Sequence, residues 1–209
     1  GLIRRPLPAD GSDTPEEVAR EVRAALGVDD GPIADLVGVL EAAGVVVVMR
    51  GLGSERIDAM VSWPEAQRPV VLLGDHIPAD RQRFSVAHEL AHAVMHQVPT
   101  ESQEAEADRF AAEFLMPARD ILPDLSAGPV SVPTLARLKE KWRVSIAALL
   151  RRAWDLDVIS DGRYRQLNIE LARAGYRSVE PVVLEEETPS LLGRMVKERI
   201  AGGESVAEI

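Results

Sequence analysis

Cysteine is absent from the 209 residues of this sequence. Disulfide bonds, thiolate catalysis and cysteine metal sites are therefore excluded, and a metal ion would have to be bound by histidine and carboxylate side chains. The sequence also lacks an apolar run long enough to cross a membrane, and no charged and then apolar leader stands at its N-terminus. We therefore expect a cytoplasmic protein that does not contact a membrane.

Positive charge is scarce as well. The chain has 24 Lys and Arg residues against 34 Asp and Glu residues, which gives a formal net charge of −10. Non-specific binding to nucleic acid depends on Lys and Arg side chains that neutralise phosphates, so we expect no direct nucleic-acid binding by this chain. Apolar residues make up 46% of the sequence, which is sufficient for a sizeable hydrophobic core.

Histidine is rare but concentrated. Three of the four histidines, His88, His92 and His96, are four residues apart within residues 80–98, a stretch with the pattern of a helix. Residues at this spacing lie on one face of a helix. Apolar residues surround them, so the helix is predicted to be largely buried, and its imidazoles then need hydrogen-bond or metal partners.

The first two of these histidines belong to an H-E-x-x-H motif at residues 88–92. The motif is short, and its other interpretation is a helix whose polar residues face solvent. The apolar surroundings favour zinc instead. In that case His88 and His92 bind one ion, and Glu89 lies beside it, where a carboxylate can take a proton from a water activated by the metal.

A catalytic zinc ion needs a third protein ligand and one open position. Residues 100–115 are predicted to form the next helix, in which Glu104 and Asp108 share a face. One of these carboxylates can bind the metal while the other accepts the spare ring N–H of a ligand histidine. Glu106 is an alternative third ligand. Glu113 lies farther along the helix and is predicted to be a surface acid.

The two remaining histidines allow two interpretations each. His96 is either a group that contacts the substrate or transition state, or a histidine capped by a neighbouring carboxylate. His76 follows a predicted strand and is either an electrostatic stabiliser near the site or a loop residue without chemistry. No tyrosine precedes Tyr164. The sequence therefore does not identify the group that would stabilise an oxyanion.

Apolar periodicity and turn residues predict an α+β fold. Residues 1–13 are expected to be an extended arm, residues 14–125 a first domain, and residues 130–209 a helical C-terminal region, with a loop-rich boundary at residues 118–133. Residues 185–187 are predicted to form a solvated acidic turn.

Two helices in the C-terminal region, at residues 132–142 and 145–156, resemble a helix-turn-helix, although such pairs are often packing units. The other helices are expected near residues 14–26, 32–43, 80–98, 100–115, 161–174 and 188–201, and strands at residues 45–49, 59–63 and 69–73, the last two as a hairpin whose edge could face a peptide.

Two segments together resemble a known family. Residues 88–96, with His88-Glu89-Leu90-Ala91-His92 and Met95-His96, and residues 104–117 are similar to the signature of ImmA/IrrE-type metallopeptidases. The second segment matches the pattern E-x-x-A-[ND]-x-F-A-x-x-L-L-M-P, with Phe114 in place of the usual leucine. The resemblance covers about residues 30–120 well and the later helices more loosely.

The resemblance implies a zincin-like domain with a helical region after it. It assigns Glu104 as the third zinc ligand and Asp108 as the acid that supports a ligand histidine. It also implies a zinc endopeptidase of narrow specificity that acts on a regulatory protein, typically a helix-turn-helix repressor of the XRE type, in transcription control under stress. Two other functions remain open, a zinc-containing sensor or binding module of a transcription regulator and the toxin half of a toxin–antitoxin pair.

Overall fold

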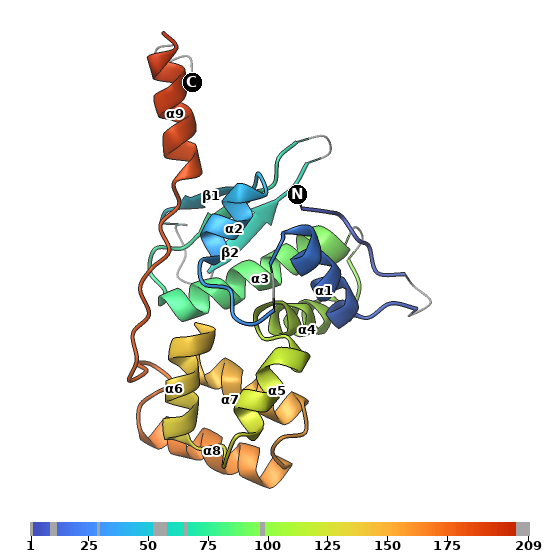
Figure 1. Cartoon of the computed structure of the whole chain (residues 1–209), viewed down its shortest axis with the longest axis vertical. Coiled ribbons are helices and arrows are strands. Elements are labelled where there is room, and N and C mark those ends of the chain that lie inside the picture. The colour runs from blue at the N-terminus through green and yellow to red at the C-terminus, as the bar shows by residue number, and fades with distance from the viewer. Residues whose placement is uncertain are drawn as a thin grey trace.

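The computed structural model describes residues 2–8, 12–28, 30–51, 58–64, 67–96 and 99–203. These residues form helices and one small sheet, so the predicted α+β class is confirmed. In chain order the elements are α1 (Pro15–Ala25), α2 (Leu36–Ala42), β1 (Val46–Met49), β2 (Ala59–Ser62), β3 (Val70–Leu73), α3 (Ala79–Met95), α4 (Gln103–Leu115), α5 (Ala118–Ser126), α6 (Val132–Trp142), α7 (Ile146–Asp155), α8 (Asp161–Arg173) and α9 (Leu191–Ala201). Figure 1 shows the sheet and α1 to α4 in the upper part of the molecule and α5 to α8 in the lower part.

The sheet has the strand order β1-β3-β2. β1 runs parallel to β3, with Val47 opposite Val71, and β2 runs antiparallel to β3, with Val61 opposite Val71. The antiparallel pair is the hairpin predicted from the sequence, although residues 65–66 of its turn lie outside the described residues. β2 is therefore an edge strand, and α3 packs beside it.

The helix that carries the histidine row buries an apolar face in the core. α3 begins after Pro78, and Asp80 lies in its first turn near the positive end of the helix dipole. Val86, Leu90 and Val94 are buried in the core, as the apolar pattern predicts. α3 ends at Met95 with His96 as its C-cap residue, and residues 97–98 of the predicted helix lie outside the described residues.

α4 packs against both α3 and α1 (Figure 1). Thr14 and Glu17 form a capping box that starts α1, and Pro15 occupies the first turn. In α4, Phe110 and Phe114 are buried and stack with ring centroids 5.6 Å apart. The buried rings place one face of α4 in the hydrophobic core.

α2 and α9 begin later than the sequence pattern indicated, as does α4, which starts at Gln103 instead of residue 100. α2 starts at Leu36 instead of residue 32, because the Asp35 side chain accepts from the N–H of Gly38 and caps the helix there. α9 starts at Leu191 instead of residue 188, because the carboxylate of Glu41 accepts from the N–H groups of Ser190 and Leu191. A carboxylate from another helix thus decides where α9 begins.

The prediction of a loop-rich segment at residues 118–133 was wrong for its first half. The structure has a helix, α5, with Pro123 inside it. Ile121 and Leu125 are four residues apart and fully buried, and Asp124 accepts a hydrogen bond of 2.7 Å from Nε1 of Trp142. These tertiary contacts outweigh the local cost of the proline.

The prediction that Glu113 is a surface acid was also wrong. Its side chain is only 3% exposed and forms ion pairs with Arg152 and with Arg20, the latter at 3.1 Å. Its carboxylate also accepts from the N–H of Ala118 at the start of α5. The partners come from α1 and α7, which are distant in sequence, so no local pattern around Glu113 revealed them.

The expected solvated turn at residues 185–187 holds for Glu185 and Glu186, which are exposed, but not for Glu187. Glu187 forms a buried ion pair with Arg83 of α3 and accepts from the N–H of Val37 at the start of α2. Residues 177–190, which we call the strap, connect α8 to α9 along one side of the molecule (Figure 1). Glu187 fastens the strap to the upper part.

Further buried charges join the two parts. Lys139 of α6 pairs with Asp80 of α3 and, at 2.7 Å, with Glu180 of the strap.

The predicted division at residues 125–130 stays a prediction. Of the predicted arm, residues 1 and 9–11 lie outside the described residues, and residues 2–8 have no regular structure. None of the helices in the described part of the chain combines the length and apolar character that crossing a bilayer requires.

Candidate metal centre

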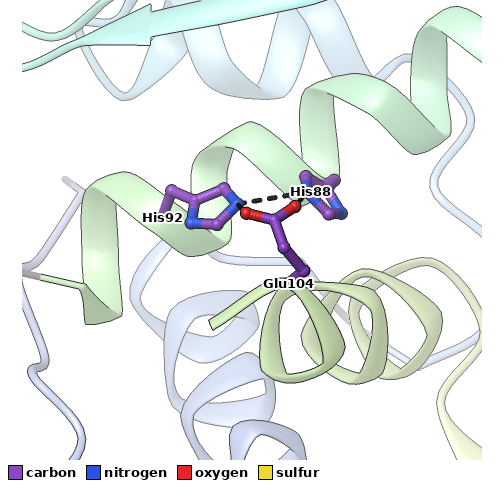
Figure 2. Close-up of side chains that lie close together, drawn as sticks. All are labelled: His88, His92 and Glu104. Atoms are coloured by element: carbon purple, nitrogen blue, oxygen red, sulfur yellow. Dashed lines mark hydrogen bonds and ion pairs between the residues drawn. The ribbon is translucent and has the colours of Figure 1, made fainter. Parts of the chain in front are cut away.

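The ring nitrogens of His88 and His92 point toward one carboxylate. Both residues project from α3, and Glu104 approaches them from the first turn of α4 (Figure 2). The two Nε2 atoms are 3.1 Å apart. Oε2 of Glu104 lies 3.3 Å from Nε2 of His88, and its Oε1 lies 3.6 Å from Nε2 of His92. Among the described residues, these three side chains form the group of potential metal ligands, with one ligand atom from each within 4.8 Å of the others.

The spacing of these atoms fits zinc. A tetrahedral ion with ligand bonds of 2.0–2.1 Å places its ligand atoms about 3.3 Å from one another. The observed separations of 3.1, 3.3 and 3.6 Å are close to that value. Two imidazoles and a carboxylate are also the donor set of many catalytic zinc sites, in which a fourth position stays open. The residues therefore fit a catalytic zinc ion.

His88 is oriented by Asp108. Nδ1 of His88 lies 2.9 Å from Oδ1 of Asp108, one helical turn after Glu104 on α4. A carboxylate only accepts, so Nδ1 carries the proton and the Nε2 lone pair faces the ligand group. The hydrogen bond to Asp108 also raises the pKa of His88. Asp108 thus lies beside a candidate ligand histidine, in the position that the family resemblance implies for it.

His92 has a different partner. Its Nδ1 lies 2.9 Å from Nδ1 of His96, and Nε2 of His96 lies 3.0 Å from Oε2 of Glu106. Burial lowers the pKa of His92, and the neighbouring imidazole of His88 adds to this effect. Glu106, the alternative third ligand, therefore contacts His96 and lies outside the ligand group. Its other oxygen accepts from the hydroxyl of Ser102, a contact that the sequence analysis missed.

Glu89 lies between the ligand helix and the sheet. Its carboxylate accepts a hydrogen bond from the backbone of Val61 in β2, and burial raises its pKa. A carboxylate with a raised pKa is better suited to receive and return a proton near neutral pH. No signal in the sequence linked Val61 to this site, because the contact depends on how β2 lies across α3.

His76 lies apart from these residues. Its Nε2 is 3.9 Å from Oδ1 of Asp58, and Asp58 also pairs with Arg81 at 2.6 Å. The structure therefore places His76 in a small surface network beside the sheet, and does not bring it together with the other three histidines.

A cleft of about 1650 Å³ borders Asp108, but His88, Glu89, His92 and Glu104 are not among the residues that line it. Phe84 lies one turn before His88 on the same face of α3, and it lines the cleft together with Asp108. The opposite wall is formed by α7, α8 and the strap, with Leu156, Leu171 and Val183 among the lining residues. The cleft thus lies between the α3–α4 pair and the lower part of the molecule, beside the candidate ligands and not over them.

Most charged side chains around the cleft are already paired. Arg109 bonds both oxygens of Glu16, and Arg151 bonds Asp155 at 2.8 Å. Arg152 pairs with Glu113, as described above. The cleft therefore offers neutralised charge and apolar side chains to a ligand.

Comparisons with known proteins place these observations in a family. The family model Peptidase_M78, described as the IrrE N-terminal-like domain, matches residues 40–153, more than half of the chain. A solved structure of a Mycobacterium tuberculosis transcriptional regulator is similar at 16% sequence identity and a TM-score of 0.48. The similarity covers 66% of this chain and 45% of that chain. A comparison with curated proteins gives no match.

Proposed function

The chain belongs to the Peptidase_M78 family of IrrE N-terminal-like domains, and we propose that it is a zinc-dependent endopeptidase. The observation that carries the proposal is the ligand group itself, in which His88, His92 and Glu104 converge at separations that fit one zinc ion. Glu89 lies beside this group, as a general base requires. This arrangement supports a zincin-like site.

Glu89 moves the proton in the proposed reaction. When zinc is bound by these residues, it supplies Lewis-acid chemistry, which polarises the scissile carbonyl and lowers the pKa of water. Glu89 accepts the proton of the attacking water and returns it to the leaving amine. Asp108 holds His88 in the orientation that presents Nε2 to the ligand group.

The edge of the sheet supports a peptide substrate. The outer edge of β2 (Ala59–Ser62) is not paired with another described strand, and its Val61 contacts Glu89. A peptide that adds to such an edge in an extended conformation forms main-chain hydrogen bonds with it. A substrate bound in this way passes directly over the general base.

The size of the cleft supports a protein substrate. Small-molecule sites usually enclose about 300–1,000 Å³, whereas this cleft measures about 1650 Å³ and is bordered by Asp108. Its apolar lining and paired charges suit an apolar segment of a folded protein that extends beyond the scissile bond. Resemblance to ImmA/IrrE-type peptidases suggests a helix-turn-helix repressor of the XRE type as the substrate.

The α6–α7 pair fits a packing unit better than a DNA reader. Lys139 of α6 and Arg152 of α7 are buried in ion pairs with α3 and α4, and are therefore directed into the protein. A protein that reads DNA directs such side chains toward phosphates. With a net charge of −10, the chain is expected to bind its protein partner without contacting nucleic acid.

The Glu89→Gln variant tests the proposal. The substitution keeps the shape of the side chain and leaves the three ligands unchanged, so zinc content measured by elemental analysis should stay at about one ion per chain. Loss of a general base typically lowers the rate by about 10²- to 10⁴-fold. Cleavage of a co-expressed XRE-type repressor, followed by immunoblot, should therefore stop.

Two outcomes contradict the proposal. If the wild type contains no zinc, the metal site is wrong. If both proteins relieve repression equally while the repressor stays full length, the protein acts by binding, as a sensor module or a toxin component would.

A further inference from the structure

The two ligand histidines are supported in different ways, and the second way involves His96. His88 donates directly to a carboxylate, Asp108. The Nδ1 atom of His92 instead faces another imidazole, that of His96, at 2.9 Å. The His96 side chain is almost fully buried and lies at the end of α3, with its backbone N–H bonded to the carbonyl of His92.

Proton positions along this contact are fixed by elimination. If Nε2 of His92 presents a lone pair to a metal, its neutral ring carries the proton on Nδ1 and donates it. Nδ1 of His96 must then accept, which leaves the proton of His96 on Nε2. That nitrogen lies 3.0 Å from Oε2 of Glu106, which only accepts. Ser102 donates to the other oxygen of Glu106 at 2.8 Å and holds the carboxylate in place.

We infer that His96 and Glu106 form a positioning pair, which sets the tautomer and orientation of His92 through a bridging imidazole. The inference rests on the proposed function, in which His88, His92 and Glu104 are the metal ligands. His96 is then not a group that contacts the substrate. Its role is to connect His92 to a carboxylate that projects from a different side of α4 and contacts His96 instead of the ligand.

The elements explain why the support has two forms. Asp108 lies one turn beyond Glu104 on α4, and His88 lies one turn before His92 on α3. Glu106 is only two residues from Glu104 and therefore projects in another direction. It reaches the end of α3 at His96, one turn after His92. The row of histidines on α3 thus extends beyond the two ligands to His96, which contacts a second carboxylate, that of Glu106.

Nuclear magnetic resonance of the zinc-loaded full chain tests the proton positions directly. Long-range ¹H–¹⁵N correlations distinguish imidazoles protonated on Nδ1 from those protonated on Nε2, and single substitutions assign the four histidines. We expect a proton on Nδ1 of His88 and His92 and on Nε2 of His96. A proton on Nδ1 of His96 would overturn the inference. The proposed function would still stand in that case, as long as the chain binds zinc.

Zinc affinity, measured by competition with a chelator, tests the function of the pair. Loss of a group that orients a ligand typically weakens metal binding by about 10- to 100-fold. We expect this loss for His96→Leu and for Glu106→Ala. His96→Gln should recover most of the affinity, because its amide oxygen can accept from His92 and its NH₂ group can donate to Glu106.

Glu101→Ala is the matched control. It removes the same charge from an exposed position near the start of α4, and should leave the zinc affinity unchanged. Equal affinities for wild type, His96→Leu and Glu106→Ala would contradict the inference, and so would an equal loss in His96→Gln and His96→Leu. If His96→Leu does not fold, the Glu106→Ala titration and the wild-type spectrum still decide.

Discussion

The two ends of α4 carry acids with opposite environments. Near its start, the side chains of Glu104 and Asp108 are 68% and 64% exposed and face imidazoles. Near its end, Glu113 is 3% exposed and faces two arginines. The first end is open, as a site that binds a metal and a substrate requires. The second end is closed, and joins α4 to α1 and α7.

The difference shows where each end contributes free energy. A buried carboxylate is tolerated only while its charge is paired, so removal of one partner is costly. An exposed carboxylate retains much of its hydration, so its removal changes folding little and affects mainly the groups that it orients. We therefore expect substitutions at the closed end to change stability and those at the open end to change metal binding.

The largest effect should come from Glu113→Ala. This variant leaves Arg152 buried without its carboxylate partner, and breaking a buried pair in this way typically costs about 3–5 kcal/mol. Urea unfolding of the metal-free protein measures the loss. Glu104→Ala is the control at the open end and should change the free energy of unfolding by no more than about 0.5 kcal/mol. Equal losses of unfolding free energy in the two variants would contradict the difference that we infer between the two ends of α4.

Asp108→Ala should have the next largest effect, and on a different quantity. Zinc affinity should fall by about 10- to 100-fold, or about 1.4–2.7 kcal/mol, because His88 loses the acceptor that orients it. A chelator competition titration measures this loss. Asp108→Asn should retain part of the affinity, since its amide oxygen can still accept from Nδ1. If Asp108→Ala binds zinc as the wild type does, Asp108 is an ordinary surface acid.

Val183→Asp tests whether the substrate occupies the cleft. Val183 lines the cleft and is 88% exposed, so the change should not affect folding. Partial burial of a valine against a substrate contributes about 1 kcal/mol, so kcat/KM for the repressor should fall by about fivefold at unchanged zinc affinity. Ile169→Asp, at an exposed position on α8 outside the cleft, should have no effect. Equal rates in both variants would exclude the strap from substrate binding.

The smallest effect should come from Arg109→Ala, in the middle of α4. Arg109 bonds both oxygens of Glu16 across to α1. The arginine side chain is more than half exposed. Exposed pairs contribute about 0.2–1 kcal/mol. Thermal unfolding should show a small loss that shrinks at high salt, with unchanged zinc affinity. A loss as large as that of Glu113→Ala would mean that solvent exposure does not separate the two kinds of ion pair.

The sequence predicted most of the fold and the positions of the candidate ligands. Local spacing was sufficient, because a row of histidines four residues apart lies on one face of any helix, and short β-branched runs between turn residues form strands. The helix at residues 118–126 was missed because Pro123 dominated the local pattern, whereas the burial of Ile121 and Leu125 is a tertiary effect.

By itself, the sequence determined that His88, His92 and Glu89 share one helix and that acids follow on the next. Only the tertiary structure decided what each acid does. Glu104, Glu106 and Glu113 are the same residue type on the same helix, and helical periodicity gives only their directions. The imidazoles or arginines that they meet come from α1, α3 and α7, and the packing of those helices decides whether a carboxylate faces a metal site, a histidine or a buried cation.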